Sequence, residues 1–204
     1  THHRSQAANY SNYPNPASYT YEVLTKNFYD DYSWRSGEGN PLSASRSSSY
    51  DGYLLSADNS NFPYPQDATS QNNMLRGMPT GSKTKVLGTS DYTYAIPFYD
   101  DRGKSIQVQT TNITGKTDIL INQYSWTGQT LLTVVKHEKE NPNTQTIVAV
   151  TRMSYDSLFR LVKTEKKISS SKVNSGSMPG AYTIQSEIEY DALGQLKKKK
   201  LEVL

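Results

Sequence analysis

One short motif occurs four times in the second half of the chain, and it constrains the fold more than any other feature of the sequence. The motif starts with Tyr, continues in most copies with Asp, has Gly three residues after the Asp position, and precedes an apolar run. Its copies are Tyr99-Asp100-Asp101-Arg102-Gly103, Tyr124-Ser125-Trp126-Thr127-Gly128, Tyr155-Asp156-Ser157-Leu158-Phe159 and Tyr190-Asp191-Ala192-Leu193-Gly194. Four copies of one motif, each followed by an apolar run, indicate an array of β-hairpins in which neighbouring units bury each other's faces.

Each residue type in the motif has a structural task at a turn. Asp accepts hydrogen bonds from the backbone amides that follow it, and Gly takes the positive φ that closes a type I turn with a bulge. The Tyr ends the incoming strand, and we expect its ring to pack over the next unit. We therefore interpret the following residues as structural: Tyr99, Asp100, Gly103, Tyr124, Gly128, Tyr155, Asp156, Tyr190, Asp191 and Gly194.

Two copies of the motif depart from the pattern. Ser125 replaces Asp in the second copy and retains a weaker form of the same hydrogen bond. Phe159 replaces Gly in the third copy. Because a positive φ costs a bulky residue about 1 kcal/mol or more, we expect the third turn to adopt another geometry.

Between these turns, short runs of β-type residues follow one another without helical spacing. They cover residues 92–99, 104–112, 116–124, 130–138, 144–155, 160–167, 182–190 and 195–203. This pattern predicts an all-β fold of antiparallel hairpins that form a twisted or curved sheet. Pro97 cannot donate to a ladder, so we expect it at a strand edge or a bulge.

The first half of the chain differs in composition. We divide the sequence into an extended or disordered segment (1–20), a strand followed by a long Ser/Asn/Tyr-rich insertion (21–90), and the repeat region (91–204). Strands are expected near residues 22–29 and 83–87. The insertion is expected to lie across a sheet through its apolar and aromatic residues, namely Tyr50, Tyr53, Leu54, Leu55, Phe62 and Tyr64. Both ends of the sequence resemble cut ends of a longer chain.

Composition excludes several classes of function. The 22 Lys and Arg nearly balance the 19 Asp and Glu, which gives no electrostatic footprint for nucleic acid. The chain has no Cys and no apolar stretch of the length that a membrane span needs. His2, His3 and His137 do not form a ligand set, and no phosphate-binding glycine loop or nucleophile motif occurs. We therefore predict no catalytic residues, no metal and no cofactor.

Two kinds of charged cluster have ordinary explanations. The pairs Asp30-Asp31 and Asp100-Asp101 follow Tyr at expected turns, so turn formation is favoured over acid–base chemistry or Ca²⁺ binding. The lysines Lys197–Lys200 lie in an expected strand, where alternate side chains point to opposite faces. We expect some of them to protect a sheet edge against pairing.

The motif copies resemble the YD repeats of Rhs and teneurin-type proteins, in particular the Rhs-repeat surface proteins of Bacteroidetes. The stretch from Phe98 to Thr110 is similar to a repeat opening of that family, and the stretches 81–89 and 28–34 are similar to its segments between repeats. The resemblance implies a β-ribbon that coils into a hollow shell, which in some members encloses a toxin or another C-terminal domain. It also implies a secreted or cell-surface bacterial location. No residue here matches the family's self-cleaving core region.

The resemblance makes a structural scaffold or encapsulating segment, without catalysis of its own, the first functional hypothesis. Its partners would be the remaining repeats of the parent chain or another protein, and the sheet edges would allow self-association. The alternative is a carbohydrate- or partner-binding β-module, in which sugars stack on the rings of Tyr32, Trp34, Tyr124 and Trp126. A hydrolase is the third hypothesis, and it would need two convergent carboxylates in a cleft.

Overall fold

The computed structural model describes residues 21–68, 70–140 and 142–201. The chain divides into two compact units: unit 1 comprises Thr1–Arg46 and Gln71–Thr117, and unit 2 comprises Ser47–Ser70 and Asp118–Leu204. The boundaries expected at residues 20 and 90 followed composition, whereas these units follow packing. As a result, the Ser/Asn/Tyr-rich insertion is shared between the two units.

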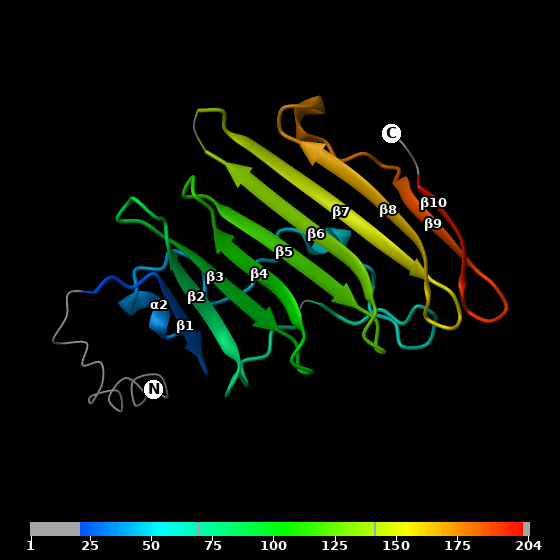
Figure 1. The fold of residues 1–204 in the computed structure, drawn as a ribbon, viewed down its shortest axis with the longest axis horizontal. Helices are drawn as coiled ribbons and strands as arrows, with labels where there is room; N and C mark the ends of the chain where they lie inside the picture. The colour runs from blue at the N-terminus through cyan, green and yellow to red at the C-terminus, as the bar shows by residue number, and fades with distance from the viewer. Residues whose placement is uncertain (1–20, 69, 141, 202–204) are drawn as a thin grey trace. The chain divides into compact units, whose positions relative to one another are not determined.

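Unit 1 contains four antiparallel strands that pair in chain order (Figure 1). They are β1 (Thr25–Tyr29), β2 (Pro79–Lys85), β3 (Tyr92–Tyr99) and β4 (Ser105–Thr111). Its short helix α2 (Trp34–Gly37) belongs to the segment that connects β1 to β2.

Unit 2 contains the remaining strands of the described residues, again antiparallel and paired in chain order. They are β5 (Thr117–Tyr124), β6 (Thr130–Lys139), β7 (Gln145–Tyr155), β8 (Leu161–Ser170), β9 (Thr183–Tyr190) and β10 (Leu196–Leu201). Two single-turn 3₁₀ helices, Asp51–Tyr53 and Asn174–Gly176, complete the regular structure. The predicted all-β antiparallel fold is confirmed. In the described residues, no helix has the length and apolar character needed to cross a membrane.

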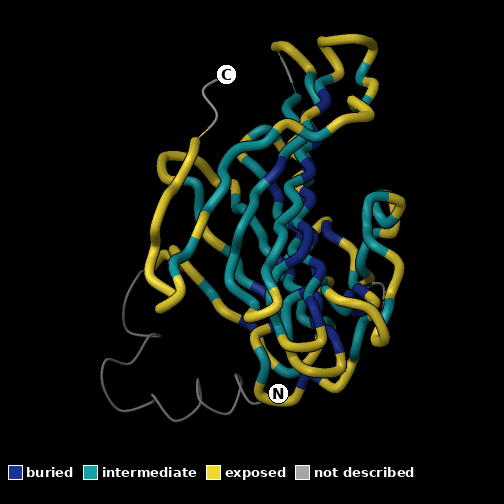
Figure 2. The backbone as a smooth tube through the Cα atoms, turned by 90° about the vertical axis from the view of Figure 1, so that its right-hand side faces the viewer, coloured by how far each residue is buried: buried dark blue, intermediate teal, exposed yellow. Residues whose placement is uncertain are grey.

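The core of unit 2 lies on one face of its sheet. Alternate residues of β5, β6 and β7 point to this face and are buried, and Figure 2 shows buried positions concentrated in the strands while turns are exposed. The cluster consists of Ile119, Ile121, Leu132, Val134, Val148 and Val150. Residues from two remote segments pack against it: Tyr50, Tyr53, Leu54, Met178 and Tyr182. The expectation that Tyr50, Tyr53 and Leu54 lie across a sheet is therefore confirmed.

Gln123 fastens this covering segment to the sheet. Its side-chain amide donates to the carbonyl oxygens of Leu55 (2.7 Å) and Gln66 (2.9 Å), and its Oε1 accepts from the Leu55 N–H (2.8 Å). Gln123 is 1% exposed, and its bond to Gln66 is buried, while its two bonds to Leu55 are partly buried. The Gln side chain thus takes the place of a strand neighbour for backbone groups of the covering segment.

Charged side chains on the same face of unit 2 pack against the rings of the cover. The Lys167 Nζ lies 4.8 Å from the centroid of the Tyr182 ring and 5.4 Å from that of Tyr53. The Arg152 guanidinium lies 4.4 Å from the Tyr182 ring and binds the buried Glu165 carboxylate at 2.9 Å. Burial raises the pKa of Glu165, but hydrogen bonds from Arg152 and Lys163 outweigh burial and lower it overall. The cover is therefore fixed by cation–π contacts as well as by apolar packing.

The opposite face of the unit 2 sheet carries an apolar row that remains accessible to solvent. Cross-strand pairing aligns Leu120, Val135, Ala149 and Ile168 on β5 to β8. Val135 is 42% exposed and Ile168 is 49% exposed. One face of this sheet is thus covered by the chain's own segments, and the other presents apolar side chains to solvent.

The core of unit 1 forms where the segment after β1 folds over its sheet. Trp34 of α2 stacks on Phe28 of β1 with the ring centroids 3.9 Å apart. Tyr32 contacts the ring of Phe98, and Phe98 and Ile96 are fully buried. Gly81 of β2 lies directly beneath Trp34, because a Cβ atom at residue 81 would overlap the indole ring.

Pro97 lies in a part of β3 that is paired on one side. It pairs with Val108 of β4 one residue before a register shift, whereas the pairing of β3 with β2 ends at Ala95. This position agrees with the expectation of a strand edge or a bulge. Because no β2 residue pairs with Pro97, no ladder acceptor on that side needs its missing N–H. The Tyr32 hydroxyl, from the covering segment, donates to the Pro97 carbonyl oxygen at 2.8 Å.

Replacing Gly81 with Ala tests the close contact with Trp34. The new Cβ would also lie 2.8 Å from the Ala95 carbonyl oxygen, so the backbone would have to shift. We expect Gly81→Ala to lower the free energy of unfolding by about 2 kcal/mol or more, measured by urea denaturation. Gly180→Ala is the control, because a Cβ there meets no atom within 4 Å, and it should change stability by less than about 0.5 kcal/mol. Equal stability of the two variants would contradict this packing.

Candidate functional site

Five turns of the structure share one hydrogen-bond pattern. The N–H of the first turn residue donates to the carbonyl of the residue four positions later, and the fourth residue's N–H donates back to the first residue's carbonyl. In the first turn these bonds are Asp100 to Lys104 (3.0 Å) and Gly103 to Asp100 (3.2 Å). The turns begin at Asp100, Asn112, Ser125, Asp156 and Asp191.

The side chain of the first residue closes the same turn. One carboxylate oxygen of Asp191 accepts from the backbone amides of Leu193 (2.9 Å) and Gln195 (2.8 Å). Asp156 accepts in the same way, and the backbone amide of Arg160 is the main cause that lowers its pKa. A carboxylate held ionised by amides is suited to fixing a turn rather than to donating a proton near neutral pH.

One of the five turns was missed by the sequence reasoning. Asn112 takes the place of Asp, and its Oδ1 accepts from the amides of Thr114 (2.9 Å) and Lys116 (3.3 Å). Gly115 occupies the fourth position with a φ of 81°. The motif begins with Tyr, and Thr111 stands at that position instead. The signal that would have found this turn is Asn or Asp followed by Gly three residues later.

The third turn is not irregular, so that prediction was wrong. Phe159 adopts a φ of 59°, and the Asp156 turn has the same bonds as the others. A positive φ has a local cost for Phe159, but a residue distant in sequence contacts its side chain. The ring of Phe62, in the covering segment, lies 5.7 Å from that of Phe159. A contact between aromatic rings contributes about 0.5–1.5 kcal/mol, which is enough to offset the local strain.

The Tyr that precedes a turn links neighbouring strands through its hydroxyl. Each of three tyrosines donates to the carbonyl of the first residue in the strand before it: Tyr99 to Pro79 (2.8 Å), Tyr155 to Thr130 (2.8 Å) and Tyr190 to Leu161 (3.0 Å). The hydroxyl thus reaches the preceding strand, while the expected packing of the ring over the next unit stays a prediction. Burial raises the pKa of Tyr99 and Tyr155, so both hydroxyls remain protonated donors.

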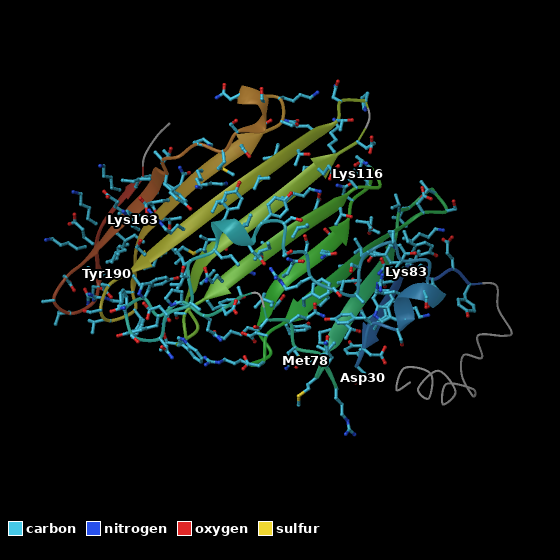
Figure 3. All side chains as sticks on the ribbon, turned by 180° about the vertical axis from the view of Figure 1, so that it is seen from behind. Asp30, Met78, Lys83, Lys116, Lys163 and Tyr190 are labelled. Carbon is cyan, nitrogen blue, oxygen red and sulfur yellow. The ribbon has the colours of Figure 1, made fainter. Side chains whose placement is uncertain are left out.

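Arg160 couples the third and fourth turns. Its Nε donates to the Asp156 carboxylate at 2.7 Å, and its guanidinium lies 4.5 Å from the centroid of the Tyr190 ring. Figure 3 labels Tyr190 on this part of the sheet. The motif residues are therefore connected to one another as well as to the backbone.

The four aromatic residues considered for sugar stacking lie in two different units. In unit 1, Tyr32 and Trp34 are engaged with Phe98 and Phe28, as described above, and burial raises the pKa of Tyr32 to about 12. In unit 2, Tyr124 ends strand β5 and is half-buried, whereas Trp126 is 44% exposed at the second turn. Trp126 is thus the member of this set whose ring is most open to a ligand.

A cluster of lysines and tyrosines in unit 1 was not anticipated. Lys83 on β2 places its Nζ 4.1 Å from the centroid of the Tyr92 ring and 3.3 Å from a Glu38 carboxylate oxygen. Glu38 also pairs with Lys26 of β1, and hydrogen bonds from the two lysines lower its pKa against the effect of burial. A cavity of about 570 Å³ is lined by these side chains together with residues 21–23. The pairing of β1 with β2 creates the cluster, and that pairing is not evident from local sequence.

The remaining charged pairs have local partners. Asp30 accepts from the Gly77 amide at 2.7 Å, and its own N–H donates to Met78, which Figure 3 labels beside it. Asp31 accepts from Ser33, which lowers its pKa. His137 pairs with Asp118 at 2.8 Å. His2 and His3 lie outside the described residues. Within residues 21–68, 70–140 and 142–201, no group of three or more His, Asp or Glu could hold a metal ion.

No protein-family model matches the chain, and a search of the curated proteins also returned no match.

Two substitutions at residue 159 test the conformation of the third turn. If φ is positive there, Phe159→Gly should be more stable than Phe159→Ala by about 1 kcal/mol, because both lose the ring but only Gly accepts this φ without strain. Urea denaturation of the two variants measures the difference. In an ordinary strand conformation the order would be reversed, with Ala the more stable.

Proposed function

We propose that this chain is a structural scaffold segment of a larger exported repeat protein of the Rhs/YD type, with no catalysis of its own. The observation that carries the proposal is the use of the motif's polar groups. The carboxylates of Asp100, Asp156 and Asp191 accept backbone amides at the turns. The tyrosine hydroxyls donate to backbone carbonyls. Groups committed in this way hold strands together, which supports the scaffold proposal.

A second observation favours a supporting or enclosing role. The apolar row Leu120, Val135, Ala149 and Ile168 lies on a sheet face that is accessible to solvent. Exposed contiguous apolar area on a soluble protein commonly marks an interaction surface. In the proposed role, this face contacts the remaining repeats of the parent chain or an enclosed polypeptide. The proposed secreted or cell-surface location rests on the family resemblance alone.

Carbohydrate binding is the second candidate, and one observation favours it. Trp126 exposes 44% of its surface next to a turn, where a sugar ring could stack on it. A glycan array that compares the chain with Trp126→Ala tests this candidate. Binding that disappears in the variant supports it, and binding that persists removes this site.

The scaffold proposal predicts that the chain binds an apolar dye and associates in a concentration-dependent manner through the exposed row. The variant Val135→Thr/Ile168→Thr keeps β-branched side chains in the sheet while reducing apolar area, so both signals should fall while the circular dichroism spectrum is unchanged. The measurements are dye fluorescence and sedimentation velocity.

Leu87→Thr/Leu158→Thr is the matched control, because both leucines are exposed outside the strands. It should leave both signals near the wild-type level. A dye-silent, monomeric wild type would contradict the scaffold proposal and favour a self-contained binding module.

A further inference from the structure

Among the described residues, the outer edge of β10 has no neighbouring strand. β10 pairs with β9 and with no other strand in the described part of the chain, and Figure 1 shows it in red with β9 on one side. Every residue of β10 is exposed. The backbone N–H and C=O groups on its outer side can therefore accept an extended segment by strand addition.

This edge carries four consecutive lysines, Lys197–Lys200. Side chains alternate along a strand, so Lys198 and Lys200 point to one face of the sheet and the other two point to the opposite face. A lipid surface or a nucleic acid duplex that approached either face would meet two of the four lysines and would not pair with the backbone groups of the edge. A strand added at the edge could place acidic side chains beside Lys198 and Lys200 and also pair with those backbone groups. The edge therefore favours a polypeptide partner.

Charge alternates across the strands that lead to this edge. Lys163 of β8 lies opposite Glu187 of β9, and Glu187 lies opposite Lys200 of β10; Figure 3 labels Lys163. Glu189 lies opposite Lys198, and in both β9–β10 pairs the Nζ is 3.9 Å from a carboxylate oxygen. Opposite charges on directly paired residues stabilise a sheet, and like charges destabilise it. A strand paired with the outer edge of β10 would therefore be stabilised by acidic side chains opposite Lys198 and Lys200.

We propose that β10 binds, by strand addition, an extended polypeptide segment with Asp or Glu at every second residue. β9 shows the pattern in the chain itself, since Glu187 and Glu189 flank Ile188 and face the lysines of β10. A second copy of β10 does not fit, because antiparallel self-pairing would place Lys opposite Lys. The inference goes beyond the scaffold role, since it depends only on strands β8 to β10. The sequence analysis expected self-association through the sheet edges. The lysines make this edge unfavourable for pairing with a second copy of β10.

A peptide with the β9 sequence, residues 183–190, is the probe. A control peptide carries Glu187→Lys and Glu189→Lys in the same sequence. Fluorescence anisotropy with the full chain should give a dissociation constant on the order of tenfold lower for the acidic peptide, because two attractive cross-strand pairs replace two repulsive ones. Added salt should reduce the difference. Hydrogen exchange should show new protection in β10 and none in β1, the strand at the end of the unit 1 sheet.

Two variants of the chain complete the test. Lys198→Gln/Lys200→Gln should remove the preference for the acidic peptide without introducing like charges opposite Glu187 and Glu189. Arg76→Gln/Lys172→Gln removes the same charge at exposed positions outside the strands and should retain the preference. Circular dichroism checks that both variants are folded.

The proposal is overturned if the two peptides bind equally, or if the protected amides lie outside β10. It is also overturned if phosphatidylserine vesicles bind the wild type, lose binding in Lys198→Gln/Lys200→Gln, and the acidic peptide does not bind. That last result would assign the lysines to a lipid surface.

Discussion

The structure depends on how five of its strand reversals are closed by the first side chain of the turn. Where the chain turns back, the ladder ends and backbone amides lose their partners, and in five turns an Asp, Asn or Ser side chain accepts from them. Because the same pattern recurs, successive strands start at defined positions. A defined start fixes the register, and the register decides which side chains reach the buried face.

The tyrosine before the turn adds a lateral connection. Its hydroxyl binds the first carbonyl of the strand before it, as Tyr155 does with Thr130. Turn closure and lateral hydrogen bonding thus use the two recurring chemical features of the motif, and neither requires a ligand. Segments remote in sequence then cover one sheet face in each unit, with Gln123 and Trp34 as the clearest points of attachment. This division of tasks is typical of a framework protein, and it is why we propose a scaffold.

Most of the strand pattern could be predicted from the sequence because it is set locally. Strand β3 has the predicted bounds, and β5 to β9 begin and end within a few residues of the predicted runs. The start of β2 was missed, because Pro79 and Gly81 read as turn residues when the ring of Trp34 above them is not considered. Phe159 was misread for the same reason, since its partner Phe62 is distant in sequence. The Lys83 cluster likewise depends on a strand pairing between remote segments.

The central claim is that the side chain at the first turn position stabilises the sheet, and alanine substitution there tests it most directly. Urea denaturation of Asp100→Ala, Asp156→Ala and Asp191→Ala should show a loss of about 1–2 kcal/mol each, because each change leaves two turn amides without their acceptor. Asp101→Ala, one residue beyond the first turn position and exposed, should change stability by less than about 0.5 kcal/mol. If the three turn variants are as stable as Asp101→Ala, the turns do not organise the sheet and the account is wrong.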